Sequence, residues 1–312
     1  MSKIPVIIDT DPGIDDLTAI LLANSCEKFD IKAITAVSGN VEYQKVCKNA
    51  LDIADFLNID CRVGKGAARP LLVEPVFGHD IHGNSGLGTV VLPDAKREFD
   101  PKPAWDIIYE EAVAAEGKLV IFAIGPLTNI ALALLKYPDL AGLIDHIYSM
   151  GGSAGAGNKM PYGEFNYVVD PHAAEILFKS GIDFTMVGLD ACHYATCGVE
   201  LFDRLSKADS KVARVLKDLS KHYLSLNSAI GDKQTFTLFD AITVAVAIDP
   251  TMLQAEYHNI SCELKSPMTF GQSVVDFYDK TGKPNKCRVA RTIDKQKYEA
   301  VMLNMAEYYE TH

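Results

Sequence analysis

The chain lacks the paired cysteines of a disulfide-rich or zinc-binding protein. Its seven cysteines are an odd number scattered over 312 residues, and none forms a CxxC pair. Neither a disulfide framework nor a thiolate zinc site is therefore expected. The N-terminus also lacks the basic segment and long apolar core of a signal peptide. Because scattered, reduced thiols are typical of the cytosol, we expect a cytoplasmic protein.

The sequence also lacks an excess of positive charge and long hydrophobic runs. A formal net charge of -11 argues against partners such as nucleic acid or an anionic membrane, since binding either one requires a basic face. The apolar runs are too short to span a bilayer. These absences leave a small, neutral or cationic molecule as the expected ligand.

The composition is that of a globular protein with a large core, with 48% hydrophobic and 23% charged residues. No linker rich in Pro, Gly, Ser or charge divides the chain, so we expect one domain over residues 1–312. Short β-branched runs that end in polar or Gly-rich turns alternate with stretches of helical periodicity. This pattern predicts an α/β fold with an open, mostly parallel sheet flanked by helices.

The predicted strands end where polar residues collect. Strands are expected at 6–8, 31–37, 119–124, 144–150 and 184–189, helices from Asp15 and over 127–135, a mainly helical region over 199–248, extra strands over 254–293, and a closing helix over 295–309. Acidic and amide side chains follow the carboxyl ends of several of these strands. Open α/β sheets bind their ligands at that edge, so we expect the functional site there.

Four carboxylates crowd the turn after the first strand. Asp9, Asp11, Asp15 and Asp16 fall within eight positions and would repel one another strongly without a cation among them. Oxygen ligands suit a hard ion such as calcium or magnesium, and no His or Cys lies between them to favour zinc. Helix capping would explain Asp15 and Asp16 but not Asp9 and Asp11. The charge pattern therefore favours a metal site.

A long Gly-rich loop over residues 150–166 forms a second polar cluster. It carries Asn158, Glu164 and Asn166, whose amide and carboxylate groups suit the hydroxyls of a sugar. The loop matches neither a P-loop nor a GxGxxG motif that opens a helix, so a phosphate cradle is not favoured. A solvated surface loop would explain the glycines, but not an acid and two amides set among Met160, Phe165 and other apolar residues.

These motifs together resemble the inosine/uridine-preferring nucleoside hydrolases. The octet Asp9-Thr10-Asp11-Pro12-Gly13-Ile14-Asp15-Asp16 is similar to the N-terminal signature of that family. Further similar blocks, in the family's order and spacing, are Gly39-Asn40, His82 to Gly88, Ile124 to Asn129, Met150 to Asn166 with Asp170-Pro171, and Val187 to Asp190. The likeness runs from near the start to about residue 250.

The resemblance implies hydrolysis of the N-glycosidic bond of a small-molecule ribonucleoside to ribose and free base. It implies a metal-bound water activated by Asp11 as general base, and a homodimer or homotetramer. The implied calcium ligands are Asp11, Asp16, the carbonyl of Ile124 and Asp240, and the implied ribose contacts are Asp15, Asn40, Asn158, Glu164 and Asn166, with Met150 along the sugar face.

The sequence departs from the family beside the last metal ligand. The pair is Phe239-Asp240, whereas many members carry His-Asp, the His helping to protonate the departing base. His82 is the remaining candidate acid because an imidazole titrates near neutrality, although a loop His next to Gly83 is also compatible with a structural role. We expect Phe239 to stack on the base. The region where the family places further base contacts holds His222, Tyr223 and Asn227.

Two alternatives stay open from the sequence. A haloacid-dehalogenase-like phosphatase also begins with a DxD strand end, but that family has Thr or Val two positions after the second Asp, where this chain has Gly13. The other alternative is a calcium-dependent nucleoside- or ribose-binding protein without turnover. Release of free base, of phosphate, or of nothing distinguishes the three.

Overall fold

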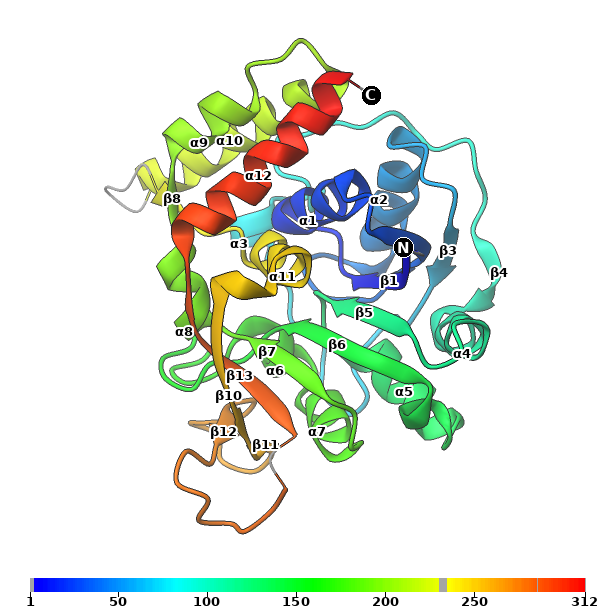
Figure 1. Cartoon of the computed structure of the whole chain (residues 1–312), viewed down its shortest axis with the longest axis vertical. Helices are drawn as coiled ribbons and strands as arrows, with labels where there is room; N and C mark the ends of the chain where they lie inside the picture. The colour runs from blue at the N-terminus through cyan, green and yellow to red at the C-terminus, as the bar shows by residue number, and fades with distance from the viewer. Residues whose placement is uncertain (1–2, 230–234, 285, 312) are drawn as a thin grey trace.

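The computed structural model describes residues 3–229, 235–284 and 286–311. A nine-stranded sheet lies at its centre in the order β10-β13-β7-β6-β5-β1-β2-β3-β4 (Figure 1). Its strands are β1 Ile4–Thr10, β2 Phe29–Ala36, β3 Arg62–Lys65, β4 Asp100–Pro103, β5 Leu119–Ala123, β6 Ile144–Met150, β7 Phe184–Val187, β10 Leu253–His258 and β13 Cys287–Ile293. Neighbours pair in parallel except β10 with β13. The predicted mostly parallel sheet is confirmed.

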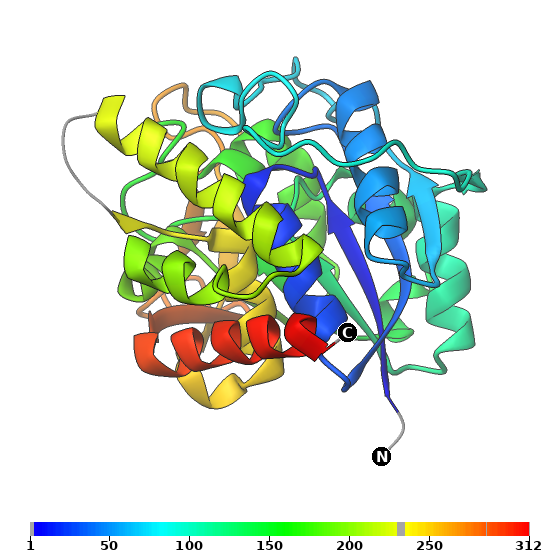
Figure 2. The ribbon, with the colours of Figure 1, turned by 90° about the horizontal axis from the view of Figure 1, so that it is seen from above.

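Helices cover both faces of this sheet (Figures 1 and 2). One face carries α1 Ile14–Ser25, α2 Tyr43–Phe56, α9 Val199–Leu205, α10 Lys211–Ala229, α11 Phe239–Ile248 and α12 Lys295–Thr311. The other face carries α4 Ala104–Ala114, α5 Thr128–Lys136 and α7 Pro171–Lys179. Short helical turns are α3 His79–His82, α6 Phe165–Val169, α8 Leu189–Cys192, η1 Leu140–Gly142, η2 His193–Ala195 and η3 Pro250–Met252.

The central strands are apolar throughout because both of their faces are buried. Along β5, Val120 and Phe122 face the core under α1 and α11, whereas Leu119 and Ile121 face the core under α4 and α5. Such continuous apolar runs are typical of parallel sheets with helices on both sides. Each fully buried side chain of this kind contributes about 1.5–3 kcal/mol, so the strands anchor the sheet edge that carries the site.

The chain reverses its direction of winding at β1. β2, β3 and β4 follow on one side of β1, and β5, β6 and β7 follow on the other. A crevice therefore opens at the carboxyl ends of β1 and β5. β1 is longer than the sequence predicts, because Asp9 and Thr10 still pair with Thr35 and Ala36 of β2. The octet thus begins inside the sheet.

The sequence pattern does not predict β3, β4 and α4. β4 spans four residues, of which Pro101 and Pro103 lack an N–H, and such a strand survives only at the edge of a sheet. β3 is equally short. Unlike the equally short but fully apolar β7, these two strands contain charged residues, Gly or Pro and form no apolar run, so residues 62–114 carried no element prediction.

The C-terminal part adds the predicted extra strands and closing helix. β10 and β13 extend the sheet, while β11 Ile260–Cys262 pairs with β12 Ser273–Val275, and β8 Cys197–Gly198 with β9 Thr235–Phe236. Helix α12 buries Tyr298, Met302 and Met305 against α1 and α11, as its apolar stripe predicts.

All seven cysteines are free thiols. In the described ranges no helix has the length and apolarity that crossing a membrane requires.

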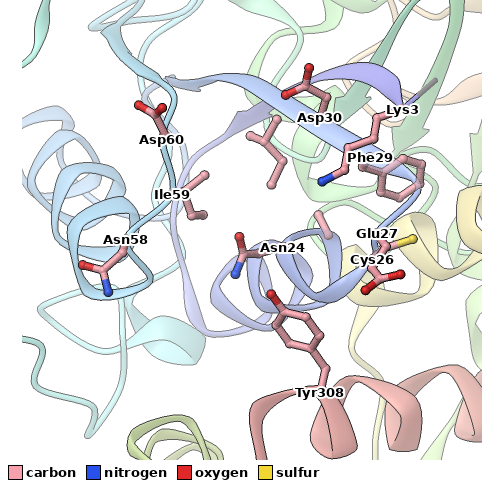
Figure 3. Close-up of a pocket in the computed structure, with 12 residues that line it drawn as sticks. Lys3, Asn24, Cys26, Glu27, Phe29, Asp30, Asn58, Ile59, Asp60 and Tyr308 are labelled. Carbon is pink, nitrogen blue, oxygen red and sulfur yellow. The ribbon is translucent and has the colours of Figure 1, made fainter. Parts of the chain in front are cut away.

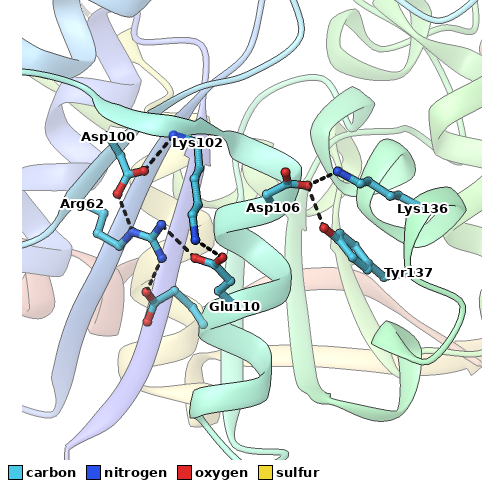
Figure 4. A network of polar contacts seen from close by, with 8 residues as sticks. Arg62, Asp100, Lys102, Asp106, Glu110, Lys136 and Tyr137 are labelled. Atoms are coloured by element: carbon cyan, nitrogen blue, oxygen red, sulfur yellow. Dashed lines mark hydrogen bonds and ion pairs between the residues drawn. The ribbon is translucent and has the colours of Figure 1, made fainter.

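An ion-pair network holds the β3–β4 edge against α4 (Figure 4). The guanidinium of Arg62 contacts Asp100 at 2.8 Å, Glu110 at 3.0 Å and Glu111 at 2.9 Å. The Arg62 side chain is 26% exposed, so these pairs are only partly screened by solvent. Arg62 therefore connects β3, β4 and α4, which the few backbone hydrogen bonds of two short strands would join weakly.

We predict that Arg62→Met lowers the free energy of unfolding by about 1–3 kcal/mol, because it leaves carboxylates of β4 and α4 without their shared cation. Urea denaturation at low and high salt measures this, and the loss should shrink in high salt. The matched control is Lys32→Met, whose exposed pair with Asp30 should contribute less than about 1 kcal/mol. Equal losses in the two variants would contradict the role given to the network.

Candidate active site

A cavity of about 320 Å³ lies at the carboxyl edge of the sheet, where the sequence predicts the site. Its lining includes Asp15, Asn40, His82, Ile124, Met150, Asn158, Glu164, Asn166, Phe239 and Asp240. Predicted site residues from distant parts of the sequence thus meet there, but Asp11 and Asp16 are not among the described lining residues. A second cavity of about 300 Å³ lies at the amino ends of β1 and β2, where Lys3, Glu27 and Asp30 give it mixed charge (Figure 3). None of the predicted site residues lines that second cavity.

Three carboxylates meet where α1 and α11 begin. Oxygen atoms of Asp15, Asp16 and Asp240 all lie within 4.8 Å of one another. Asp16 is fully buried and Asp240 is 3% exposed. Asp16 is fixed by Thr10 Oγ1, which donates to Oδ1 at 2.5 Å, and by Gly13 N, which donates to Oδ2 at 2.8 Å. The octet's turn therefore aims its carboxylates at the first turn of α11.

Crowding and burial change the acidity of these groups. Burial raises the pKa of Asp15 to about 6 and that of Asp16 to about 6. Burial also raises the pKa of Asp240 well above its usual range, and the charges of Asp15 and Asp16 raise it further. Carboxyls in this state are hard to ionise together unless a cation lies among them.

Asp11 lies beside this group of three and is fully buried. Its Oδ2 accepts a hydrogen bond from Asn40 N at 2.7 Å, while its Oδ1 is buried and has no hydrogen-bond partner within the described residues. Burial raises the pKa of Asp11 well above its usual range, followed by the charge of Asp16. A Cβ at position 39 would lie 2.0 Å from Asp11 Oδ2, so Gly39 is needed for this approach.

These observations fit a hard cation. The donor set is made of oxygen atoms, one of them a buried carboxylate oxygen without a partner, and the carbonyl of Ile124 belongs to a residue of the same cavity lining. The group with mutual distances below 4.8 Å contains Asp15, which the resemblance assigns to ribose, rather than Asp11. The four carboxylates are near enough to shift one another's pKa, so the cluster is compatible with a metal site.

The predicted sugar-binding amides are fixed by the backbone around them. Asn40 Nδ2 donates to Asp11 O at 3.0 Å and to Asp16 Oδ2 at 3.1 Å. Asn166 Nδ2 donates to Met150 O at 3.1 Å and to Ile124 O at 3.2 Å. These contacts link the ends of β1, β5 and β6. The amides are therefore held in position before a ligand arrives.

Glu164 and Asn158 shape the loop that follows β6. Glu164 is the N-cap of α6, and its carboxylate accepts from Asn166 N at 2.9 Å and Gly152 N at 2.9 Å. Burial raises its pKa to about 7. Asn158 is exposed, and its Oδ1 accepts from Phe165 N at 2.9 Å. Both side chains thus fix the loop through hydrogen bonds and also line the cavity, and their contact with a sugar stays a prediction.

One part of the cavity lining, here called the apolar wall, consists of apolar and aromatic side chains. It includes Ile81, Phe165, Tyr223 and Phe239. His222 Nε2 lies 2.8 Å from Ile81 O and so joins α10 to α3, while the side chain of Asn227 lies outside the described part. Phe239 meets the ring of His193 edge to face at 6.2 Å. A flat aromatic group is the kind of ligand such a wall would accept.

His82 lines the same cavity and is held by the backbone at the start of α1. Ile14 N donates to its Nδ1 at 3.3 Å, which places the proton of the neutral ring on Nε2. Burial lowers the pKa of His82 to about 4. At neutral pH the ring is therefore an uncharged hydrogen-bond donor rather than an imidazolium.

Several contributors were not identified from the sequence. Asn129 Nδ2 donates to Asp9 Oδ1 at 2.8 Å, and Thr35 Oγ1 donates to the same oxygen at 2.5 Å. Asp9 thus braces β1 against β2 and α5, away from the group of three carboxylates. Lys159 also lines the cavity. Asn129 and Lys159 lie inside family-like blocks and Thr35 in a predicted strand, but residue type alone did not show which way each side chain points.

Comparison with known proteins agrees with this geometry. The family model described as inosine-uridine preferring nucleoside hydrolase matches residues 6–300. The chain belongs to this nucleoside hydrolase family. It is 36% identical over 293 residues to the non-specific ribonucleoside hydrolase RihC of Salmonella paratyphi B, covering 94% of each chain. This membership makes the chain a hydrolase of ribonucleoside N-glycosidic bonds, and it argues against a phosphatase or a binding protein without turnover.

Solved structures of nucleoside hydrolases share the whole fold. A purine-preferring ribonucleoside hydrolase from Gardnerella vaginalis superposes with a TM-score of 0.92 at 29% identity, covering 99% of this chain and 100% of that one. A plant nucleoside hydrolase gives a TM-score of 0.90 at 28% identity, covering 97% and 98%. The nucleoside hydrolase fold predicted from the sequence is thus confirmed.

We predict that a divalent cation raises the melting temperature more at pH 8 than at pH 5. Folding raises the pKa of Asp15 and Asp16 to about 6, so the metal-free folded chain binds more protons than the unfolded one. Its stability from these groups therefore falls as pH rises from about 4 through that value. A cation removes this penalty, but below pH 6 it must displace protons.

Calorimetry of chelator-treated protein with and without CaCl₂ or MgCl₂ measures the effect. A ligand at 100 times its dissociation constant stabilises by about 2.7 kcal/mol. Asp60→Asn, which changes an exposed carboxylate, should leave the effect intact. A gain that is equal at both pH values, or absent at both, would show that no cation binds these carboxylates.

Proposed function

We propose that the chain is a calcium-dependent hydrolase that cleaves ribonucleosides to ribose and free base with Asp11 as general base. The observation that carries this proposal is one cavity that joins a buried group of carboxylates to an apolar, aromatic wall. The first end suits a polar sugar and the second a flat base. A bound calcium ion would supply positive charge that lowers the pKa of the carboxyls and orients oxygen atoms of sugar and water.

The residues of the acidic end suit the charge that develops during the reaction. As the C1′–N bond breaks, the ribose becomes an oxocarbenium-like cation. Carboxylates and amides held in fixed positions stabilise that charge in the transition state more than in the ground state. Asp11, Asp16 and Asp240 would hold the metal with the Ile124 carbonyl, and Asp15, Asn40 and Asn166 would contact the ribose. Met150, Asn158 and Glu164 would complete the sugar site.

Asp11 is suited to accept the proton of the attacking water. Its Oδ1 has no partner among the described residues, so this oxygen is available to accept a hydrogen bond. The Asn40 N–H fixes the other oxygen and so the orientation of the carboxylate. General-base catalysis by such a group contributes about 10²–10⁴-fold.

We assign the stabilisation of the departing base to Phe239 and His82. Phe239 has no proton to donate, so we assign it to stacking on the base. His82 would act from Nε2, because its Nδ1 already accepts from Ile14 N. As a neutral ring it would donate a hydrogen bond to the base rather than supply a free proton. His82 is therefore our candidate acid, acting as a hydrogen-bond donor to the departing base.

We further infer that the enzyme works in the cytoplasm as a homodimer or homotetramer. This inference rests on the family resemblance and on the free thiols of all seven cysteines. Sedimentation of the calcium-loaded protein tests the assembly, and a monomer at micromolar concentration would contradict it.

Asp11→Asn should retain the fold but lower kcat by about 100-fold or more, because an amide cannot accept the water proton. Nucleoside binding should persist in weaker form. Base and ribose release from inosine, adenosine, guanosine, uridine and cytidine measure the loss, with Asp60→Asn as the exposed control. Turnover near that of the wild type would show that Asp11 is not the general base.

Phe239→His should raise turnover of pyrimidine nucleosides relative to purine nucleosides. Purines offer N7 as a protonation site remote from the scissile bond, whereas pyrimidines accept the proton near it, so a new donor should help pyrimidines more. The wild type should accordingly prefer purine nucleosides and activated aryl ribosides. His82→Ala should slow natural nucleosides more than an aryl riboside. A wild type that prefers uridine, together with an unchanged rate in His82→Ala, would refute this account of the leaving group.

A further inference from the structure

Lys159 brings a positive charge into an otherwise acidic cavity. Among the described residues of the lining, the carboxylates are Asp15, Asp80, Glu164 and Asp240, and Lys159 is the one Lys or Arg. The side chain is partly buried. An ammonium is costly to desolvate, so its presence in a ligand cavity requires an explanation.

The ammonium of Lys159 is held in place by groups that leave part of its bonding capacity unused. Nζ donates to Phe77 O at 3.1 Å and lies 5.5 Å from the centre of the Phe165 ring. The main chain is pinned as well, because Lys159 N donates to Gly163 O at 3.1 Å. An ammonium has three N–H donors, and Phe77 uses one of them. The others are available to a molecule in the cavity.

These contacts place the charge beside the aromatic ring of Phe165, which also lines the cavity. Phe165 belongs to the apolar wall together with Ile81, Tyr223 and Phe239. Phe77 lies in the segment that leads into α3, which carries Ile81. Lys159 therefore bridges the loop after β6 to the segment before α3, next to an aromatic residue of the lining that we assign to the base.

We propose that Lys159 stabilises the negative charge that develops on the departing base. This inference rests on the proposed nucleoside hydrolysis. The C1′–N bond breaks and its electron pair moves onto the base, while the water oxygen bonds to C1′ and its proton passes to Asp11. The base leaves as an anion hydrogen-bonded to the Lys159 ammonium, and it then takes up the equivalent proton from solvent.

The position of the charge beside the Phe165 ring suits this role. An ammonium beside the ribose would destabilise the oxocarbenium-like cation by charge repulsion. Beside the base, it would instead stabilise negative charge that appears only as the C1′–N bond breaks. Phe239, which lines the same cavity, offers no donor. Lys159 thus gives this chain an alternative to a histidine at position 239.

The test compares Lys159→Met with Lys159→Arg, on inosine and uridine and on 4-nitrophenyl riboside, whose leaving group departs readily as an anion. Loss of one donor to a developing oxyanion costs about 100-fold or more in kcat. We expect Lys159→Met to lower kcat on the nucleosides by about 100-fold with little change in KM, and to leave the aryl riboside within about threefold. Lys159→Arg should retain most nucleoside turnover. Lys96→Met, at an exposed site, is the matched control.

The outcomes distinguish a failure of the proposed nucleoside hydrolysis from a failure of the role given to Lys159. If the wild type releases base from no nucleoside, the proposed function itself fails. If the wild type is active and Lys159→Met slows both substrate classes equally, Lys159 only braces the two loops and the proposal is wrong. An unchanged ratio with unchanged rates would also overturn it. Melting temperatures of all variants show whether each one is folded.

Discussion

Mutual repulsion among buried carboxylates is the constraint on which the rest of this structure depends. Asp11, Asp15, Asp16 and Asp240 gather at one sheet edge, and burial raises the pKa of each one. Such a group is unfavourable for folding by itself, yet the octet and α11 are built to bring it together. The surrounding fold makes the arrangement rigid, and a cation makes it favourable.

Rigidity comes from the switch point of the sheet. β1 and β5 end side by side, and hydrogen bonds from Asn40, Asn129 and Asn166 tie their ends to those of β2 and β6. Asp9 belongs to this bracing because Thr35 and Asn129 both donate to its carboxylate. Side chains that would contact a sugar are therefore fixed by main-chain groups of several strands, which is the preorganisation that electrostatic catalysis needs.

The sequence predicts structural features that repeat or cluster along the chain. It does not predict features that depend on where a side chain points. Long apolar strands and the carboxylate octet predicted the central sheet and its functional edge, because periodicity and local charge are written in consecutive residues. The short edge strands β3 and β4 have no such period. Likewise, the sequence grouped Asp9 with Asp11, although the two point to different partners, and it gave no reason to place Lys159 in the cavity.

We propose that the carboxylates at the octet and at α11 together hold one calcium ion beside the sugar. Anomalous diffraction from crystals grown in calcium, with the wild-type chain, tests it most directly. We expect one strong anomalous-difference peak in contact with Asp11, Asp16 and Asp240 and within reach of the Ile124 carbonyl. Absence of a peak at this position, or a calcium ion bound only elsewhere on the chain, would contradict it.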